Sequence, residues 1–298
     1  MTTKSPFKSG FIGIIGAPNV GKSTLLNQLL GQKIAITSEK PQTTRNRILG
    51  VAHLPGAQLV FLDTPGIHRA KGPLNVRIVE VALRVLGDVD LVVFITDAAC
   101  PDRASDEIIL NSLKKRALPV ILAINKVDLV NKETLLPFID QWRGSYPFEA
   151  IVPISALDRT QIDELVSEMV EILPEGPRYY PEDSVTDAPE GFIAAEMIRE
   201  KVFRLTGEEI PYAVAVTVES FKERPGRNLI DIQATIHVER ESQKPIIIGK
   251  GGTMLKRIGQ HAREAIEHMV GRKVFLKLWV RVQKNWTRDE RAIKKLGH

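Results

Sequence analysis

The residues with the clearest chemical meaning lie near the amino end of the chain. Residues 16–23 read Gly-Ala-Pro-Asn-Val-Gly-Lys-Ser, which fits the pattern G-x-x-x-x-G-K-S, and the apolar run 11–15 leads directly into them. Glycines let backbone N–H groups curl around an anion, and Lys22 supplies a positive charge for the β- and γ-phosphates of a nucleotide. Ser23 offers its hydroxyl to Mg²⁺, and a helix expected over 23–30 adds its positive amino end. The segment therefore predicts a P-loop that binds nucleotide phosphates.

Three later segments bear on which nucleotide is bound. Residues 63–66 read Asp-Thr-Pro-Gly, residues 125–128 read Asn-Lys-Val-Asp, and residues 155–157 read Ser-Ala-Leu. Asp63 can hold Mg²⁺ through water, and Gly66 can offer its backbone N–H to the γ-phosphate and move when that phosphate leaves.

Asp128 is the residue expected to select the base. Its carboxylate can accept hydrogen bonds from N1–H and the 2-amino group of guanine, whereas adenine lacks the amino group and presents an acceptor at N1. A site built on such donors can reject the wrong base by roughly 10⁴-fold or more. A backbone N–H within 155–157 could meet the guanine O6. Together, in this order, the motifs resemble the GTPase superfamily, whereas a P-loop kinase would leave residues 125–128 unexplained.

Two further positions bear on hydrolysis. Ile67 follows Gly66, where many GTPases place a glutamine that orients the attacking water. Isoleucine cannot do this, so hydrolysis should be slow or helped from elsewhere. Asn19 indicates one form of help, because in relatives with the pattern G-x-P-N-x-G-K-S this asparagine helps to hold K⁺ against the phosphates. Residues 40–47 resemble a switch I loop that ligates Mg²⁺ when GTP is bound, through Thr44 or, as the alternative, Thr43.

These assignments define the expected nucleotide site. The expected catalytic residues are Lys22, Thr44 and Gly66. The residues expected to contact GTP or GDP are Gly16, Ala17, Pro18, Asn19, Val20, Gly21, Lys22, Ser23, Thr24, Asp63, Thr64, Pro65, Gly66, Ile67, Asn125, Lys126, Val127, Asp128, Ser155, Ala156 and Leu157. The expected metal ligands are Ser23, Thr44 and, through water, Asp63 for Mg²⁺, with Asn19 for K⁺.

The elements that must position these motifs can also be predicted. The runs 59–63, 91–97, 120–125 and 151–155 are short and continuously apolar, as in strands buried on both faces, and helical patterns such as 103–115 and 161–172 lie between them. We therefore expect an α/β domain over residues 1–175, with a mostly parallel sheet and helices on both faces. Its functional residues should meet at the carboxyl ends of the strands.

A second domain is expected after a proline-rich linker at 176–190. Over 191–282 the pattern changes to the order α-β-β-α-α-β, with the loop Gly249-Lys250-Gly251-Gly252 between the two adjacent helices. This loop and order resemble a type II KH domain, whose GXXG loop clamps the backbone of about four nucleotides of single-stranded RNA. The residues expected to contact RNA are Ile248, Gly249, Lys250, Gly251, Gly252, Lys256 and Arg257. Residues 283–298 should form a basic tail helix that caps the RNA groove, contacts the first domain or is simply solvated.

Composition agrees with this division. The chain has 298 residues, a net charge of +5 and 43% hydrophobic residues, and none of its apolar runs approaches the 18 residues of a membrane span. Cys100 is the single cysteine, which excludes disulfides within the chain and cysteine-based zinc sites and suits the cytoplasm. Residues 1–190 carry 20 Lys and Arg against 23 Asp and Glu, a net charge of −3, whereas residues 191–298 carry 21 against 13, a net charge of +8. Such segregation predicts a polyanionic partner for the second half.

The combination resembles the Era family of bacterial Ras-like GTPases over nearly the whole chain. The resemblance is carried by GAPNVGKS at 16–23, QTTR at 42–45, DTPG at 63–66, NKVD at 125–128 and IIIGKGG at 246–252. It implies a switch protein that binds the 3′ end of small-subunit (16S) rRNA and assists maturation of the small ribosomal subunit. It also implies a cytoplasmic protein, expected to be a monomer, with some peripheral association with the inner membrane.

Two other functions remain open at this stage. A membrane-associated signalling GTPase could use its basic half on anionic lipid instead of RNA. A GTP-driven RNA-modifying enzyme would need a second catalytic site, and the sequence shows no cysteine, metal or paired-carboxylate constellation for one. The sequence leaves open the hydrolysis rate, the RNA sequence, the oligomeric state and the domain arrangement in each nucleotide state.

Overall fold

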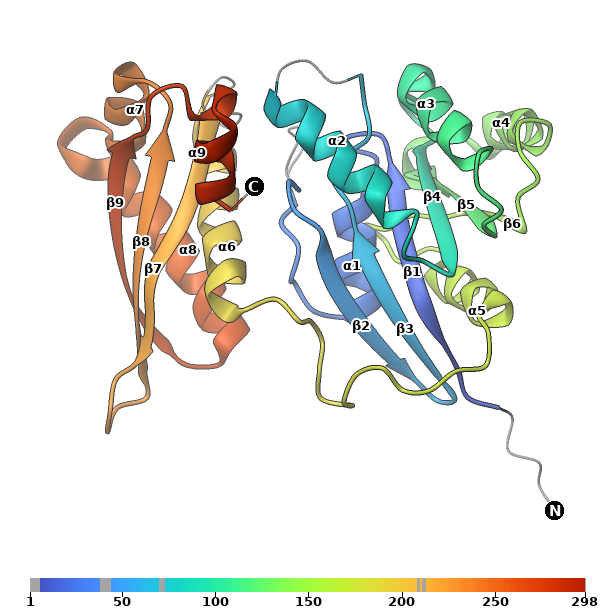
Figure 1. Ribbon diagram of the computed structural model, residues 1–298, viewed down its shortest axis with the longest axis horizontal. Helices are drawn as coiled ribbons and strands as arrows, with labels where there is room; N and C mark the ends of the chain where they lie inside the picture. The colour runs from blue at the N-terminus through green and yellow to red at the C-terminus, as the bar shows by residue number, and fades with distance from the viewer. Residues whose placement is uncertain (1–5, 38–43, 70–72, 208–209, 211–212, 298) are drawn as a thin grey trace. The chain divides into compact units, whose positions relative to one another are not determined.

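The computed structural model describes residues 6–37, 44–69, 73–207, 210 and 213–297. The chain forms two compact units, the first built mainly from residues up to Asp187 and the second mainly from Ala188 onward. We call them the amino-terminal unit and the carboxy-terminal unit (Figure 1).

The amino-terminal unit is a six-stranded sheet in the order β2-β3-β1-β4-β5-β6. All neighbouring strands are parallel except the β2–β3 hairpin, which confirms the expected mostly parallel sheet. The elements are β1 (Lys8–Gly16), α1 (Lys22–Leu30), β2 (Ile48–Leu54), β3 (Ala57–Asp63), α2 (Pro73–Val85), β4 (Leu91–Asp97), α3 (Arg103–Leu113), β5 (Val120–Asn125), a 3-10 turn (Val127–Leu129), α4 (Lys132–Arg143), β6 (Ala150–Pro153) and α5 (Ile162–Ile172).

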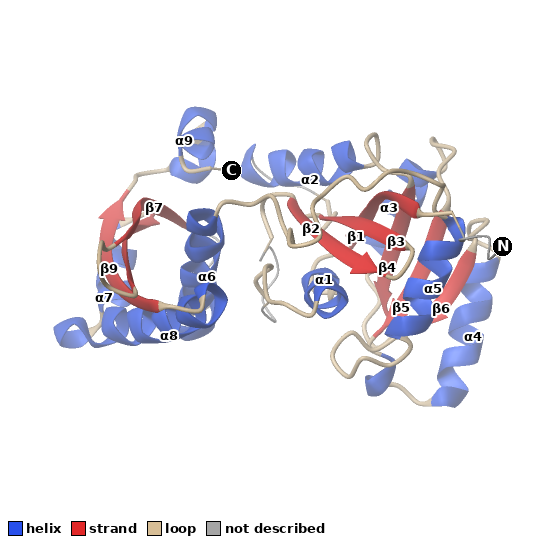
Figure 2. Ribbon diagram, turned by 90° about the horizontal axis from the view of Figure 1, so that it is seen from below, coloured by secondary structure: helices blue, strands red, loops and turns tan. Residues whose placement is uncertain are grey.

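The core of this unit explains why the sequences of its central strands are continuously apolar. One face of the sheet packs against α2, α3 and α4 in a single cluster that includes Phe94, Ile109 and Trp142. Helix α1 lies on the side of the sheet opposite α2, as Figure 2 shows, and α5 packs against β5 and β6. Because both faces are covered, β3, β4 and β5 are buried along their whole length. Strand β2 is half-exposed at its far end, and its apolar run is broken by Gly50, so the sequence did not predict it.

The predicted linker is an ordered part of the amino-terminal unit. Gln58, fully buried on β3, accepts hydrogen bonds from the backbone N–H groups of Tyr179 (2.7 Å) and Tyr180 (3.1 Å) and donates to the Tyr180 carbonyl (2.8 Å). The backbone N–H of Val51 on β2 donates to the carbonyl of Val185 (2.8 Å). The segment therefore covers the β2 edge of the sheet, which would otherwise expose unpaired backbone groups.

The carboxy-terminal unit has the α-β-β-α-α-β order expected of a type II KH domain. Its elements are α6 (Glu190–Leu205), β7 (Val214–Glu223), β8 (Leu229–Val238), a 3-10 turn (Glu241–Gln243), α7 (Lys244–Ile248), a second turn (Lys250–Gly252), α8 (Thr253–Val270), β9 (Lys273–Val282), a third turn (Trp286–Arg288) and α9 (Glu290–Lys295). The sheet has the order β7-β8-β9, so β9 is an edge strand. Strand β7 is antiparallel and β9 is parallel to β8. The inward side chains of all three strands pack with α6 and α8 in one core.

The basic tail packs against its own unit. The indole N–H of Trp286, which is fully buried, donates to the carbonyl of Ala213 (3.0 Å). Ile293 on α9 is likewise fully buried. Of the three roles left open for the tail, a fully solvated end is therefore wrong.

Candidate functional site

The predicted motifs converge on one edge of the amino-terminal sheet. Strand β1 ends at Gly16, β3 at Asp63 and β5 at Asn125, and these ends are level in the sheet because Ile14 pairs with Asp63 and Gly16 with Ile95. Parallel strands bring their carboxyl ends to the same side. This edge therefore gathers the P-loop and the motifs that begin at residues 63, 125 and 155.

The P-loop holds a buried lysine. Lys22 is 6% exposed, and its Nζ donates to the carbonyls of Ala17 (2.7 Å) and Gly16 (3.2 Å). Burial lowers the Lys22 pKa to about 8, against the opposing effect of the nearby Asp63 carboxylate. Gly21 adopts a φ of 103°, and a Cβ there would lie 2.2 Å from Nδ2 of Asn125, so the loop requires glycine.

Three side-chain oxygens meet beside this lysine. The Ser23 hydroxyl donates to Oδ2 of Asp63 (2.9 Å) and lies 2.8 Å from Oγ1 of Thr44, which in turn lies 3.5 Å from Asp63 Oδ2. Burial raises the pKa of the fully buried Asp63 to about 6, although Lys22 and these hydroxyls lower it. Oδ1 of Asp63 has no hydrogen-bond partner among the described residues. An oxygen cluster with a spare carboxylate oxygen fits a hard divalent cation such as Mg²⁺.

Thr44, the expected switch I ligand, lies beside Ser23 and Asp63. Its side chain is 5% exposed and points into the oxygen cluster, although 19 positions separate it from Asp63 in the chain. Thr43, the alternative from the sequence, lies outside the described residues.

Asn125 joins two loops of the site. Its Nδ2 donates to the carbonyl of Val20 in the P-loop (2.7 Å), and its Oδ1 accepts from the backbone N–H of Ala156 (2.9 Å). The side chain is 2% exposed, so these bonds are shielded from water. Asp128 is exposed and Leu157 is 72% exposed, which leaves both side chains accessible to a base.

Asp97 is a site residue that sequence reasoning missed. It ends β4, its Oδ2 lies 2.5 Å from Nζ of Lys126, and its Oδ1 accepts from the backbone N–H groups of Ala99 (2.9 Å) and Cys100 (3.0 Å). Lys126 has a φ of 64°, so the ion pair helps to hold a residue in an unfavourable backbone conformation. An acidic residue ending an apolar run was the available signal.

Residues 66 and 67 are held against the P-loop. A Cβ on Gly66 would lie 2.7 Å from Cα and 2.8 Å from N of Pro18, so only glycine allows this approach. The backbone N–H of Ile67 donates to the Gly16 carbonyl (3.1 Å), and its side chain is fully buried in the apolar core of the unit. The Ile67 side chain therefore points into the apolar core, and its effect on hydrolysis stays a prediction.

The Gly-Lys-Gly-Gly loop joins α7 to α8 in the carboxy-terminal unit. Gly249, Gly251 and Gly252 all have positive φ, at 74°, 61° and 80°. A Cβ on Gly249 would lie 2.7 Å from Met254, whereas one on Gly251 or Gly252 would meet nothing within 4 Å. Gly249 thus shapes the turn, while the other two glycines leave a backbone surface open to a ligand. Lys250, Lys256 and Arg257 are exposed around it.

Two features are absent from the part of the chain that the structure describes. No group of three or more His, Cys, Asp or Glu side chains is arranged to hold a metal ion. No helix in that part of the chain has the length and apolar character to cross a membrane.

Comparison with known proteins gives consistent matches over both units. Residues 11–126 match the family described as 50S ribosome-binding GTPase, and residues 209–287 match the KH domain family. The chain is 56% identical to the GTPase Era of Geobacter metallireducens and 51% identical to that of Lacticaseibacillus paracasei. Each alignment covers 99% of this chain, and 99% and 98% of the respective relative.

Two solved structures match the full length with a TM-score of 0.93 and 44% identity. One is a single-residue variant of Aquifex aeolicus Era bound to GDP·AlF4⁻, and the other is Era in complex with MgGDPNP and nucleotides 1506–1542 of 16S ribosomal RNA. Each match covers 98% of this chain and 99% of the other.

Proposed function

This chain belongs to the Era family of GTPases, and on that basis we propose that it binds the 3′ end of small-subunit rRNA and assists maturation of the small ribosomal subunit. It is a GTPase with a KH domain. The observation that carries the proposal is the presence of both parts in one chain, each with its ligand-binding elements formed. The oxygen cluster lies beside the P-loop of one unit, and the open Gly-Lys-Gly-Gly loop joins two helices of the other.

The amino-terminal unit is proposed to hydrolyse GTP mainly by positioning and charge. Mg²⁺, when bound, neutralises charge on the β- and γ-phosphates. Ser23 and Thr44 would hold it directly and Asp63 through water, while Lys22 contacts the phosphates and the backbone N–H of Gly66 reaches the γ-phosphate. The Lys22 ammonium donates to two loop carbonyls in this structure. It would exchange them for a phosphate when a nucleotide binds, because an anion binds an ammonium more strongly than neutral carbonyls do.

The remaining nucleotide contacts follow the motifs. Residues 16–24 would surround the phosphates, Asp128 would bind the guanine edge, and a backbone N–H of 155–157 would meet O6. Asn125 would act by holding the last of these loops against the P-loop.

Asn19 is proposed to hold K⁺ against the phosphates. It is exposed in the P-loop with a φ of 63°, so its side chain is accessible at the site of the phosphates. A cation there would replace part of the charge that an arginine supplies in other GTPases. Turnover of GTP by the wild type and by Asn19→Ala, measured in K⁺ and in Na⁺ buffers, tests this. Stimulation by K⁺ that disappears in the variant is expected, and equal turnover in both salts would exclude the role.

The carboxy-terminal unit is proposed to hold single-stranded RNA at residues 248–252, with Lys256 and Arg257 near its phosphates. A GXXG loop clamps about four nucleotides, and this loop leaves two glycine backbones open for such a contact. The solved Era complex contains a 16S fragment from this region of rRNA, which supports the same RNA class for this chain. We further propose that the protein is a cytoplasmic monomer with peripheral contact to the inner membrane.

A binding comparison tests the proposed function. The full chain, loaded with GDP or with a non-hydrolysable GTP analogue, is titrated with an RNA of the small-subunit 3′ end and with vesicles of phosphatidylglycerol and phosphatidylcholine at the same salt. We expect RNA binding that depends on the nucleotide and falls in Lys250→Ala. Tight binding to vesicles with none to RNA would instead support a membrane-associated signalling GTPase.

A further inference from the structure

The outward face of β9 carries an unusual row of side chains. Strand β9 alternates strictly, and its inward residues lie in the core with α6 and α8. The outward residues, all exposed, alternate between cationic and aromatic: Lys273, Phe275, Lys277, Trp279 and Arg281. We call Phe275, Lys277, Trp279 and Arg281 the β9 stripe.

The two aromatic side chains of the stripe are much more exposed than the other tryptophans of the chain. Phe275 is 50% exposed and Trp279 is 42% exposed, and both lie on one strand. The other tryptophans, Trp142 and Trp286, are buried at 9% and 0%. Exposed aromatic surface in a row is typical of a binding surface, because large aromatic side chains otherwise gain most by burial.

The charge of the stripe favours an anion. Its two cations have no acidic neighbour on β9, and Nζ of Lys277 lies 5.9 Å from the ring centroid of Trp279. On the neighbouring strands Asp231 pairs with Arg224 (2.8 Å), whereas Glu219 accepts from the neutral hydroxyl of Thr235 (2.7 Å) and keeps its charge. Among the described residues neither Lys277 nor Arg281 forms an ion pair with an acid, so both cations can meet the phosphates of a ligand.

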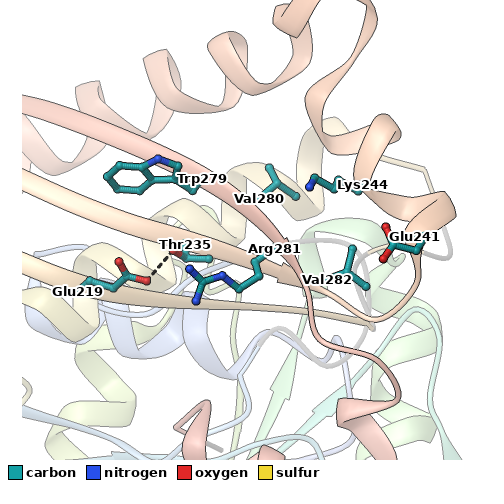
Figure 3. Close-up of a pocket in the computed structure, with 8 residues that line it drawn as sticks. All are labelled: Glu219, Thr235, Glu241, Lys244, Trp279, Val280, Arg281 and Val282. Carbon is teal, nitrogen blue, oxygen red and sulfur yellow. Dashed lines mark hydrogen bonds between the residues drawn. The ribbon is translucent and has the colours of Figure 1, made fainter.

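A hollow lies between the stripe and the start of α7. A cavity of about 430 Å³ is lined by Trp279 and Arg281, by Glu219 and Thr235 on the neighbouring strands, by Lys244 at the start of α7 and by the acidic Glu241 just before it. Figure 3 shows Arg281 and Trp279 from β9 on one side of it and Lys244 on the other. Helix α7 is five residues long, begins beside this hollow at Lys244 and ends at Ile248, next to residues 249–252, so about 7 Å of helix separates the hollow from the loop. A strand held at the loop would have to cross that distance to reach the outward face of β9.

We propose that the β9 stripe is a second RNA contact, on which two bases of the same single strand stack against Phe275 and Trp279 while Lys277 and Arg281 contact phosphates. The proposal rests on the proposed function and extends it beyond the GXXG loop. The two rings are four residues apart on a strand, or ~13 Å at ~3.3 Å per residue. This exceeds the ~3.4 Å rise of a stacked strand, so the two bases are not neighbours in one continuous stack.

RNA fits this face better than a lipid surface does. Aromatic side chains on an exposed sheet stack bases in other RNA-binding folds, since every base has a flat π face. A membrane would have to cover the strand next to the stripe as well, where Asp231 and the exposed Gln233 are polar. Burying those groups without partners costs free energy, whereas RNA can follow a single strand.

The test uses the full chain and a single-stranded RNA of about twelve nucleotides, compared with one of about four that fills only the GXXG loop. A double Phe275→Ala and Trp279→Ala variant should weaken binding of the longer RNA by about tenfold to a hundredfold, with little effect on the shorter one. Leu136→Ala removes an exposed apolar side chain, 68% exposed, in the other unit and serves as the matched control. Because all three side chains are exposed, the thermal midpoints of the variants should match that of the wild type.

Fluorescence gives an independent readout, since Trp279 is the exposed tryptophan. The longer RNA should quench the wild-type emission, and Trp279→Phe should lose the quenching while keeping affinity within a few-fold, because phenylalanine still stacks. Unchanged affinity of the double variant for the longer RNA, while Lys250→Ala weakens it, would overturn the stripe and leave the proposed function standing. No RNA binding by the wild type would overturn both. If the double variant lost binding to phosphatidylglycerol vesicles but kept its affinity for the longer RNA, the stripe would be a lipid contact and the proposal would be overturned.

Discussion

The bridge made by Asn125 between two loops gives the sharpest prediction. Asn125→Ala removes the donor to the Val20 carbonyl (2.7 Å) and the acceptor for the Ala156 N–H (2.9 Å). Val20 and Ala156 are 3% and 1% exposed, so water cannot readily replace the lost partners. Each buried backbone group left unpaired costs about 1–3 kcal/mol, and with two such groups the variant should lose about 2–6 kcal/mol of unfolding free energy.

Urea denaturation of the nucleotide-free protein measures this loss, followed by the emission of Trp142 in the same unit. Asn131→Ala is the matched control: it starts α4 but makes no capping bond with its side chain, so its cost should stay within about 0.5 kcal/mol. Asn125→Asp keeps the acceptor for Ala156 but places a second acceptor against the Val20 carbonyl. It should therefore be no more stable than Asn125→Ala.

The same bridge should affect nucleotide affinity. The site needs the P-loop and residues 155–157 at a fixed separation, and every 1.4 kcal/mol spent on restoring it weakens binding tenfold. We expect GDP to bind Asn125→Ala at least tenfold more weakly, as measured by titration calorimetry. The reasoning is refuted if Asn125→Ala and Asn131→Ala show the same stability and the same affinity.

Three other changes test separate parts of the amino-terminal unit. Gly66→Ala drives a Cβ to 2.7 Å from Pro18 and should cost about 1–3 kcal/mol in chemical denaturation, whereas Gly144→Ala, with nothing within 4 Å, should cost almost nothing; equal costs would contradict the close approach. Burial raises the pKa of Asp106 to about 6 from an ordinary 3.8, so ionisation opposes folding and stability falls as pH rises through this range. Relative to the wild type, Asp106→Asn should therefore gain about 1–2 kcal/mol between about pH 4 and pH 7, and parallel stability curves would rule out this carboxyl as the cause. Gln58→Leu removes three hydrogen bonds to the 179–180 backbone and should cost about 2–4 kcal/mol and admit protease to that segment; resistance equal to the wild type would mean that other contacts hold it.

Local sequence patterns were sufficient to predict a helix or strand wherever its own residues show a clear apolar run or period. The strands over 91–97 and 120–125 were predicted with the observed bounds, because burial on both faces leaves an uninterrupted apolar run. The order α-β-β-α-α-β was likewise readable, since each helix and strand of the second unit has its own period. Strand β2 was missed because Gly50 interrupts its apolar run and its last residues are only partly buried, so its pattern is mixed.

The linker shows the limit of composition as a guide. Its prolines and acidic residues indicate a boundary, yet the buried side chain of Gln58 and the edge of β2 hold much of it in the amino-terminal unit. Nothing near residues 179–185 in sequence signals these partners, because they lie more than 120 positions away.

The sequence by itself determined the chemistry of this protein. Residues 16–23, 63–66 and 125–128 carry the groups proposed to bind phosphate, Mg²⁺ and guanine, respectively. Each set lies within a few consecutive residues, so the sequence alone indicates it. Tertiary structure decided which side chains meet. The contact of Thr44 with Ser23 and Asp63, the Asp97–Lys126 ion pair and the alignment of the β9 stripe all depend on strand order and register. Those are set by how the whole sheet packs against its helices, which no short segment encodes.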